Sequence, residues 1–491
     1  MPATVHFIYC DINSGFYPGA HHGLAALFGS LRRAGYDYRL THLTEDTDEA
    51  GFLDLLGNLD ANAYAFSAMT NQVKYVRKFA PVLAHATEAP VLVGGVHAML
   101  EPSSVSAVEG VTCAFACEAD ESLPAWLNAH LVGRDWRDTS GICWIERGQV
   151  KFTPPKAILN LDDLPWPVYD GFDMAKIIRD LGGRLSVTLS RGCPYDCAFC
   201  CNEALRRGFG EPGYARRRSP QQAVEMVKSL VNSFKPDSVR FEDDLLLVSK
   251  RWRAEFLGLY RQQVCLPMEC NCRADLVDAD LVKLLKESGC VSLDIGVESG
   301  DEGLRNDVLG KGISDEQLIR AFDMLNASGL HTYAYNIIAL PGETSQMAWK
   351  TYHLNRRLRP SAGAVFYFYP YPHTALAQRA SREGLLRDDV EDADSYTQRP
   401  SVKPTHMSYR KMRRIYRRLR MYLLIRRFQT FFPLPVPVKK VMAVVAWWIF
   451  RFCPQVIEIL LCDSGIKRWL RRQAFRVNNR ANAAQQAKDP Q

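Results

Sequence analysis

The sequence lacks a long apolar segment, because none of its hydrophobic runs reaches the roughly eighteen residues that a membrane-spanning helix needs. The first residues also lack the basic region and cleavable apolar stretch of a secretory signal peptide. No segment repeats at the spacing of a solenoid protein. These absences argue against an integral membrane protein, an exported protein and a repeat array, and they predict a cytoplasmic protein.

The overall composition is that of a soluble globular protein. Of the 491 residues, 47% are hydrophobic and 23% are charged, which excludes wholesale disorder. A chain of this length is too long for one core and predicts roughly two to four domains. Fourteen cysteines without an export signal indicate a reducing compartment, so metal-binding or catalytic roles are expected rather than a disulfide framework.

Residues 1–132 alternate strand and helix signals. The expected strands are residues 5–11, 36–43, 63–69, 90–95 and 112–118. Alternation of this kind predicts a parallel sheet with helices on both faces. Ligands of such sheets bind at the carboxyl ends of the strands. A Rossmann-like domain is therefore predicted for this region.

A second alternation follows a connector at residues 133–178, which carries a short hairpin at residues 143–152. Its expected strands are residues 185–190, 238–241, 268–273, 291–298, 332–340 and 364–369. Six such units are too few for a closed eight-stranded barrel. An open, partial (β/α)6 barrel is therefore predicted for residues 179–378, and a helical, basic C-terminal region for residues 379–491.

The most specific feature is the segment Arg191-Gly192-Cys193-Pro194-Tyr195-Asp196-Cys197-Ala198-Phe199-Cys200, which follows the first barrel strand. Three thiolates at this spacing can wrap one [4Fe–4S] cluster and leave the fourth iron open for a chelating ligand. The alternative is a zinc site, which normally needs a fourth ligand at short spacing. Cys201 directly follows Cys200 and is poorly placed to share the same metal. Cys193, Cys197 and Cys200 are therefore predicted to bind a cluster.

The Cys-x3-Cys-x-aromatic-Cys pattern resembles the signature of the radical S-adenosylmethionine (SAM) superfamily, and the resemblance extends over residues 160–378. It implies that the open iron chelates SAM and that the reduced cluster cleaves SAM to methionine and a 5′-deoxyadenosyl radical. It also implies that the backbone at Phe199 contacts the adenine. An external one-electron reductant of the flavodoxin or ferredoxin type is the partner that the resemblance implies.

Further SAM contacts are implied at the ends of the barrel strands. Asp243 is expected to meet the SAM amino group, and Arg273 could pair with the SAM carboxylate through two hydrogen bonds. Glu298 is expected to hold the ribose hydroxyls, and the segment that begins at Asn336 resembles the adenine side. For each of these acids and for Arg273, the alternative is a salt bridge at the barrel rim.

The first domain resembles the cobalamin-binding domains that are fused to radical SAM barrels. Small residues at strand ends allow a bulky corrin ring to approach the backbone. The positions expected to bind cobalamin by this resemblance are Gly23, Ser67, Thr70, Gly94, Gly95 and His97. The resemblance therefore adds cobalamin to the expected cofactors.

One departure concerns the ligand below the cobalt. Related cobalamin domains carry Asp-x-His-x-x-Gly, but aligning that motif on Gly23 places Pro18 at the Asp position and Ala20 at the His position. Neither His21 nor His22 is in register. A cobalt without a protein histidine below it is therefore expected, and the two histidines are otherwise expected to be solvated loop residues.

The C-terminal region begins with a basic, amphipathic segment. Residues 409–430 contain nine Lys or Arg and no acid, and their apolar stripe consists of Met412, Ile415, Leu419 and Leu423. An aromatic stretch follows at residues 441–450. The combination fits a helix on anionic lipid, a helical cap on the open barrel, or a basic surface for an acidic substrate. No recognition motif supports a nucleic-acid partner.

Taken with the resemblance, these features imply a cobalamin-dependent radical SAM methyltransferase. It would methylate an unactivated carbon of a small-molecule or lipid-like substrate through a 5′-deoxyadenosyl radical and methylcobalamin. The alternative within the same family is an anaerobic oxidative cyclase, like the magnesium-protoporphyrin monomethyl ester cyclase, that acts on a tetrapyrrole. A non-catalytic cobalamin or redox sensor is the alternative from another class. No residue can be singled out as the hydrogen donor or base.

Overall fold

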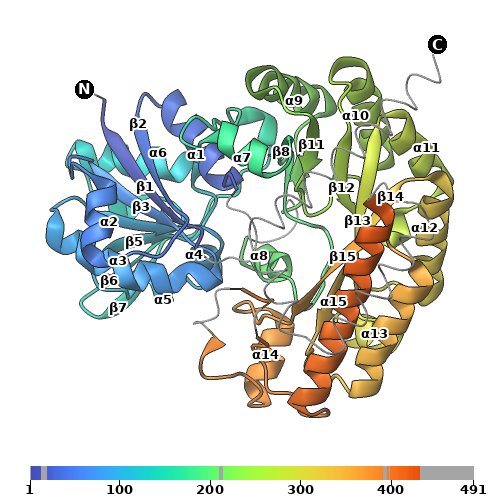
Figure 1. Ribbon diagram of the computed structural model, residues 1–491. Helices are drawn as coiled ribbons and strands as arrows, with labels where there is room; N and C mark the ends of the chain where they lie inside the picture. Colours follow the sequence, from blue (N-terminus) through green and yellow to red (C-terminus); the bar gives the residue numbers. More distant parts are fainter. Residues whose placement is uncertain (1, 13–18, 210–213, 391–394, 398, 432–491) are drawn as a thin grey trace. The chain divides into compact units, whose positions relative to one another are not determined.

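The computed structural model describes residues 2–12, 19–209, 214–390, 395–397 and 399–431 (Figure 1). The chain divides into two compact units, each built from separate stretches of sequence. The first comprises Met1–Met174, Ser190–Arg218 and Tyr369–Lys403, and the second comprises Ala175–Leu189, Ser219–Phe368 and Pro404–Gln491. The segment that carries the cysteine motif therefore belongs to the first unit, while the predicted boundaries at residues 132, 178 and 378 stay predictions.

The first unit is organised around a seven-stranded sheet of order β2-β1-β3-β4-β5-β6-β7. Its strands are β1 (Thr4–Cys10), β2 (Asp37–Leu43), β3 (Ala63–Ser67), β4 (Val91–Gly94), β5 (Val111–Phe115), β6 (Ile142–Glu146) and β7 (Gln149–Phe152). The helices between and after them are α1 (His22–Arg33), α2 (Glu49–Leu56), α3 (Val73–Ala86), α4 (Val96–Leu100), α5 (Pro102–Ser106) and α6 (Ala119–Leu131). The first five strands are parallel, as predicted.

Successive side chains of the strands pack on two different helical layers. The ring of Phe7 in β1 lies 5.2 Å from the ring of Phe28 in α1, whereas Ile8 joins the apolar cluster with Phe52 of α2 and Phe79 of α3. The period of two along a strand explains this alternation. Burial of each such side chain contributes about 1.5–3 kcal/mol. The predicted Rossmann-like sheet with helices on both faces is confirmed.

The hairpin expected in the connector is the edge of this sheet. β6 pairs antiparallel with β5, and β7 pairs antiparallel with β6. Ile142 and Cys143 are buried, while Val150 and Phe152 on the edge strand are exposed. The sequence could not reveal this pairing, because a short amphipathic hairpin has the same pattern in a linker as at a sheet edge.

The second unit contains a six-stranded parallel sheet of order β15-β14-β13-β12-β11-β8. Its strands are β8 (Arg184–Val187), β11 (Ser238–Phe241), β12 (Met268–Cys272), β13 (Cys290–Glu298), β14 (His331–Ile338) and β15 (Ala362–Tyr367). Along its outer side run α9 (Pro220–Phe234), α10 (Lys250–Gln263), α11 (Ala279–Glu287), α12 (Asp315–Ser328) and α13 (Ser345–Leu358) (Figure 1). The open, partial barrel is confirmed. A short helix, α7 (Met174–Asp180), precedes β8.

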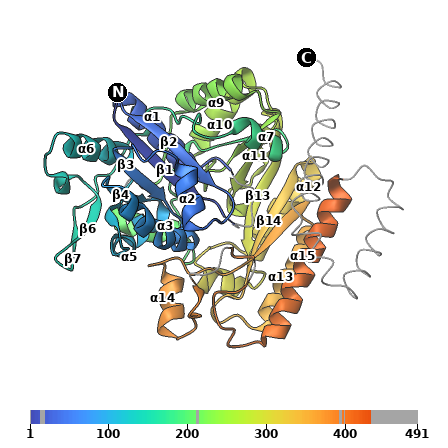
Figure 2. The same cartoon turned by 60° about the vertical axis from the view of Figure 1, so that its left-hand side comes forward.

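The basic C-terminal segment forms α15 (Tyr409–Phe431), which runs beside β15 and α13 (Figure 2). The predicted stripe of Met412, Ile415, Leu419 and Leu423 is buried. Tyr416 stacks on Tyr367 of β15 with their ring centroids 4.2 Å apart. The apolar face of α15 is therefore used for packing within the unit, while Trp447 and Trp448 lie outside the described residues. In the described part of the chain, no helix is long and apolar enough to cross a bilayer.

Candidate active site

The three motif cysteines share one loop and remain accessible. The loop leaves the two-residue strand β9 (Ser190–Arg191) and ends at α8 (Cys201–Phe209). Cys193, Cys197 and Cys200 are partly exposed, and the backbone N–H of Cys200 donates to the carbonyl of Cys197 at 3.0 Å. Within the described ranges, seven other cysteines are buried: Cys10, Cys113, Cys117, Cys143, Cys270, Cys272 and Cys290. Accessible thiols on one loop fit the ligand set of a [4Fe–4S] cluster, in which each cysteine binds a different iron.

The zinc alternative gains no fourth ligand from Cys201. This residue begins α8 and packs against the apolar cluster of Leu100, Ala204, Leu205 and Tyr214. Among the described residues, no three His, Cys, Asp or Glu side chains surround a position for a single metal ion. By contrast, burial raises the pKa of the Cys10 thiol to about 12, which suits a packing role rather than a ligand role.

Four paired charges, of which Asp120 and Arg216 are buried, anchor the cysteine loop to the first sheet. Arg191 pairs with Asp120 at 2.7 and 2.9 Å and with Glu118 at 3.1 Å. Arg216, in the strand β10 (Arg216–Arg217) that pairs with β9, reaches Glu118 at 2.5 and 3.0 Å. Both acids follow β5, where α6 begins. The loop is therefore held at the carboxyl end of β5, a contact that sequence reasoning missed.

Arg191 and Asp120 each stabilise the charged form of the other. Burial alone would lower the pKa of the Arg191 guanidinium, but Asp120 and Glu118 raise it by more, so the net shift is upward. Burial likewise raises the pKa of Asp120, but the charge and hydrogen bonds of Arg191 leave it below its ordinary value. Arg191 and Asp120 therefore both stay charged and paired near neutral pH.

An apolar contact secures the same loop next to β4. α4, which follows the Gly94-Gly95 end of β4, packs on α8 through Leu100 and Leu205. Gly192 has a φ of +77°, and a Cβ added there would lie 2.6 Å from the carbonyl oxygen of Tyr214. Only glycine fits such a position without strain. The loop thus lies beside the strand ends where cobalamin was predicted to bind.

The predicted cobalamin residues form an open edge with few side chains. A Cβ on Gly94 would meet no atom closer than 4.0 Å, whereas one on Gly95, at a φ of +94°, would lie 2.7 Å from the backbone of Ala68. Thr70 is buried, and its hydroxyl has no hydrogen-bond partner. Glycine at the strand end and an unpaired hydroxyl fit the approach of a large polar ligand to the backbone. Gly23, Ser67 and His97 belong to the same unit.

The histidines near this edge are engaged in the fold. His21 caps α1, because its Nδ1 accepts from the N–H of Leu24 at 3.1 Å, and its Nε2 lies 3.3 Å from the Ser67 hydroxyl. Burial lowers the pKa of His21 to about 4, so the ring is neutral. His22 contacts the Tyr169 hydroxyl at 2.9 Å through Nδ1, and His97 contacts Ser104 at 2.9 Å through Nε2. None of the three is a solvated loop histidine with an idle ring.

In the second unit, the predicted SAM residues at the strand ends form ion pairs or hydrogen bonds within the protein. Arg273 pairs with Asp275 at 3.0 and 3.1 Å and donates to the carbonyl of Lys311 at 2.7 Å. Glu298, at a φ of +59°, pairs with the Lys311 ammonium at 2.7 Å. Asp243 accepts the N–H of Leu189 at 2.8 Å. Lys311 was not anticipated, since its loop carries no motif.

The remaining two SAM predictions differ in environment. Phe199 is partly exposed on the cysteine loop of the first unit. The Asn336 side chain is fully buried on the helix side of the sheet, where its amide exchanges hydrogen bonds with Asn355 of α13 at 2.6 and 3.3 Å. Any SAM contact at Asn336 would therefore be made by its backbone atoms, since the side chain is buried and paired with Asn355. The SAM roles of all five residues stay predictions.

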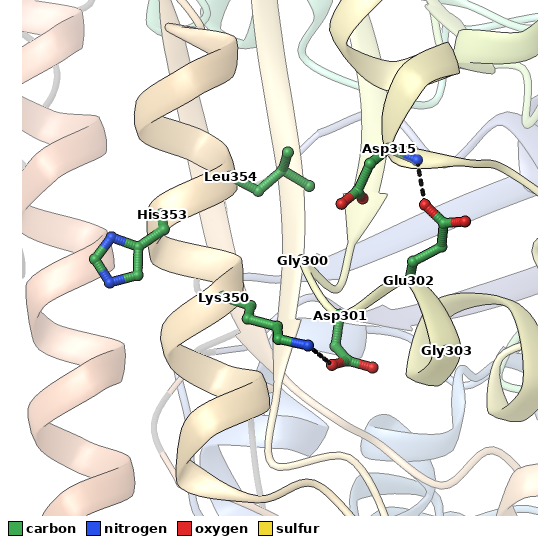
Figure 3. A pocket seen from close by; sticks show the side chains of 8 residues that line it. All are labelled: Gly300, Asp301, Glu302, Gly303, Asp315, Lys350, His353 and Leu354. Carbon is green, nitrogen blue, oxygen red and sulfur yellow. Dashed lines mark hydrogen bonds and ion pairs between the residues drawn. The ribbon is translucent and has the colours of Figure 1, made fainter.

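The second unit has an open pocket of about 400 Å³, lined by residues that follow the end of β13 and by residues of α12 and α13. Lys350 points to Asp301 and pairs with it at 2.7 Å, and Glu302 accepts the N–H of Asp315 at 2.7 Å, whereas His353 points away from these carboxylates (Figure 3). None of the predicted site residues lines this pocket.

Several known proteins are similar to this chain in sequence or in fold. Residues 187–354 match the model of the Radical SAM superfamily. An uncharacterized methyltransferase of Pyrococcus horikoshii is 25% identical over 74% of this chain and 79% of its own length. The anaerobic magnesium-protoporphyrin IX monomethyl ester cyclase of Rubrivivax gelatinosus is 24% identical over 78% of this chain and 70% of its own length. The fold is similar to that of the radical SAM methyltransferase TsrM from Kitasatospora setae, solved with cobalamin and a [4Fe–4S] cluster, with a TM-score of 0.65, 15% identity, and 78% and 75% of the two chains covered.

Proposed function

Because this chain is an enzyme of the radical SAM superfamily with the fold of a cobalamin-dependent member, we propose that it methylates an unactivated carbon of a small-molecule substrate. One observation carries the proposal: the cysteine loop and the predicted cobalamin edge belong to one compact unit. The Arg191 ion pairs and the contact between α4 and α8 hold them together. Two cofactors that act on one methyl group need a fixed mutual geometry.

In this proposal Cys193, Cys197 and Cys200 hold the cluster, and the open end of β4 at Gly94 and Gly95 accepts cobalamin, with Thr70 as a hydrogen-bonding group. When bound, the cluster would supply the electron that splits SAM, and cobalamin would carry the methyl group. His21 would not be a cobalt ligand, because its Nδ1 accepts from the N–H of Leu24 and its Nε2 lies 3.3 Å from the Ser67 hydroxyl.

The second unit would bind the polar parts of SAM. Some of the Arg273 N–H groups that donate to Asp275 would instead donate to the methionine carboxylate of SAM. Glu298 would share its carboxylate between Lys311 and the ribose hydroxyls. Asp243 would meet the amino group, and the backbone of Asn336 would face the adenine.

Two partners complete the proposal. An external one-electron reductant of the flavodoxin or ferredoxin type would reduce the cluster. Anionic membrane would be a second, peripheral contact, made by the exposed side chains of Arg410, Lys411, Arg413 and Arg414 at the start of α15. These four cations lie at a helix N-terminus without an acid in the first turn, which is unfavourable with the helix dipole and so favours an anionic partner.

The test uses SAM with a deuterated methyl group, a chemical reductant and the reconstituted protein. Methyl transfer predicts a product that carries the labelled methyl group, together with 5′-deoxyadenosine and S-adenosylhomocysteine. Formation of 5′-deoxyadenosine with a product that contains no label would reject methyl transfer.

An oxidative cyclase is the second candidate, since the Rubrivivax gelatinosus cyclase covers a similar share of this chain. It predicts loss of hydrogen and gain of oxygen in a tetrapyrrole, with no labelled methyl group. Membership of an enzyme superfamily leaves no support for a purely sensory module.

A further inference from the structure

Helix α15 runs from the carboxyl ends of the barrel strands toward their amino ends (Figure 2). In its first half, Tyr416 stacks on Tyr367, the last residue of β15, with ring centroids 4.2 Å apart. At its end, the ring of Phe431 lies 4.7 Å from the ring of His331, the first residue of β14. The first turns of α15 therefore lie at the same end of the parallel sheet as the SAM residues predicted at the strand ends.

The cations of α15 are used differently along its length. Arg426 donates to the carbonyls of Pro360 and Arg359 at 3.0 and 3.1 Å, and the Arg418 guanidinium lies 6.0 Å from the ring of Trp349. By contrast, the first two turns carry four exposed cations: Arg410, Lys411, Arg413 and Arg414. Among the residues that the structure describes, no ion pair, hydrogen bond or cation–π contact involves these four side chains. They are called the outward cations below.

The outward cations share one face of the helix. At about 100° per residue, they lie within roughly 160° of its circumference. This arc is opposite the buried stripe that contains Ile415 and Leu419. Tyr409, the first residue of α15, is 36% exposed. Neither α15 nor its neighbour α13 contains an Asp or Glu. The surface therefore combines four cations and a partly exposed aromatic ring, with no acid on either helix.

An anionic bilayer fits this surface better than a small soluble anion does. None of the outward cations lines the pocket of the second unit, and an exposed helix face does not enclose a single anion as a binding pocket would. A bilayer instead presents many anionic headgroups in one plane, so each cation adds to the attraction. Tyrosine is enriched at the depth of the headgroups, because its ring is apolar and its hydroxyl is polar. Charge complementarity therefore favours anionic lipid.

We infer that the outward cations dock the carboxyl ends of the barrel strands toward an anionic bilayer, and that the substrate of methyl transfer is a lipid of that bilayer. The inference rests on the proposed methyl transfer and membrane contact, and it specifies the substrate class. A water-soluble substrate reaches an enzyme by diffusion and needs no such docking. A lipid that leaves the bilayer exposes its methylene groups to water, which is unfavourable. Docking at the end of the sheet where SAM is expected avoids that exposure.

The experiment uses cells from which the gene has been deleted, because they retain the unmethylated substrate. The reconstituted holoenzyme receives SAM labelled in its methyl group, the aqueous extract of these cells, and vesicles made from their total lipids with added phosphatidylglycerol. The label is expected in a chloroform-soluble lipid. Label only in a water-soluble molecule would overturn the inference while leaving methyl transfer intact. Label in neither fraction would overturn the proposed function, and the inference with it.

Two matched variants then test the surface. The docking variant combines Arg410→Gln, Lys411→Gln, Arg413→Gln and Arg414→Gln. The control removes the same charge from exposed positions of α10 and α11 through Lys250→Gln, Arg251→Gln, Arg261→Gln and Lys283→Gln. Each variant is assayed with the lipid in anionic vesicles and with the same lipid in nonionic detergent micelles, which offer no charged surface.

The ratio of the vesicle rate to the micelle rate is the readout. It should fall at least about tenfold in the docking variant, and by less than about twofold in the control, relative to wild type. Rising salt should lower the same ratio in the wild-type enzyme, because it screens the attraction between the cations and the bilayer. A ratio that is unchanged in the docking variant, or insensitive to salt in the wild type, would reject docking through the outward cations.

Discussion

The guanidinium of Arg191 forms two parallel hydrogen bonds with the carboxylate of Asp120, at 2.7 and 2.9 Å, although the two residues are 71 positions apart in the sequence. Arg191 lies two residues before the first motif cysteine, and Asp120 lies in the first turn of the helix after β5. The pair therefore transmits the position of the first sheet directly to the cysteine loop.

Asp120→Asn should loosen this connection. In this variant Glu118 is the remaining acidic partner of Arg191. Breaking a fully buried ion pair costs about 3–5 kcal/mol of stability. The cost is smaller here because Arg191 is partly exposed. Chemical denaturation should show a loss of roughly 2–3 kcal/mol, and the reconstituted cluster should have a shifted reduction potential. Asp135→Asn, at an exposed pair with Arg137, is the control. Equal behaviour of the two variants would contradict the anchoring role.

The cluster assignment predicts that reconstituted wild-type protein binds about four irons per chain. Replacement of Cys193, Cys197 and Cys200 together by Ala should remove the iron and the 5′-deoxyadenosine formed from SAM. Cys201→Ala should keep both, because Cys201 packs in the apolar cluster with Leu205. SAM cleavage that survives in the triple variant would disprove the assignment.

Glu343 should make the protein less stable as the pH rises. Burial raises the pKa of its carboxyl from 4.5 to about 8, although the backbone N–H of Ala339 donates to it. The folded protein therefore keeps a proton that the unfolded chain releases, so stability falls between about pH 4.5 and pH 8 and levels off above that range.

Glu343→Gln removes this titration and should be more stable than wild type at pH 9 by a few kcal/mol, with little difference at pH 4. Urea unfolding at both pH values measures the change. Glu316→Gln, exposed on α12, should follow the wild-type curve. Parallel curves for wild type and Glu343→Gln would refute the shift.

The cobalt environment should lack a histidine ligand. Bound cob(II)alamin is expected to give an electron paramagnetic resonance spectrum without nitrogen superhyperfine splitting from an axial imidazole. His21→Ala should cost about 1 kcal/mol of stability, because it removes the cap of α1, and should leave the spectrum unchanged. Splitting that disappears in His21→Ala or His22→Ala would show that one of these histidines is the ligand.

Membrane contact should depend on charge rather than on insertion of α15, because its apolar stripe is buried. The full chain is expected to bind vesicles containing anionic lipid at low salt and to release them as salt rises. The variant with Gln at positions 410, 411, 413 and 414 should bind at least about tenfold more weakly, since each cation contributes about 1 kcal/mol. Gln at positions 250, 251, 261 and 283 is the matched control. Salt-independent binding, or none at low salt, would reject the contact.

Most of the architecture could be predicted from local patterns. The expected strand at residues 238–241 agrees with β11, and the other expected strands overlap observed ones to within a few residues at each end. At the start of α12, Ser314 and Gln317 form a capping box, whose two residues lie only three positions apart. Such signals are local, because each depends on residues a few positions apart.

The parts that escaped prediction depend on distant partners. β9 and β10 have two residues each, too few to show a period, and Arg216 meets Glu118 across 98 positions. Arg240 likewise meets Asp294, at 3.0 Å, only when β11, β12 and β13 are in register. Charges of this kind are normal on a solvated surface, so the sequence alone does not reveal their burial.

The discontinuous first unit sets an order for synthesis on the ribosome. Glu101 pairs with His373, which is translated 272 positions later, and Ala198 accepts the N–H of Leu376. Non-local contacts of this kind slow folding and leave apolar edges open to aggregation in the meantime. The N-terminal sheet therefore cannot complete its contacts until most of the chain has been synthesised. A fragment cut at residue 132 would leave Glu118 and Asp120 without the arginines that neutralise them.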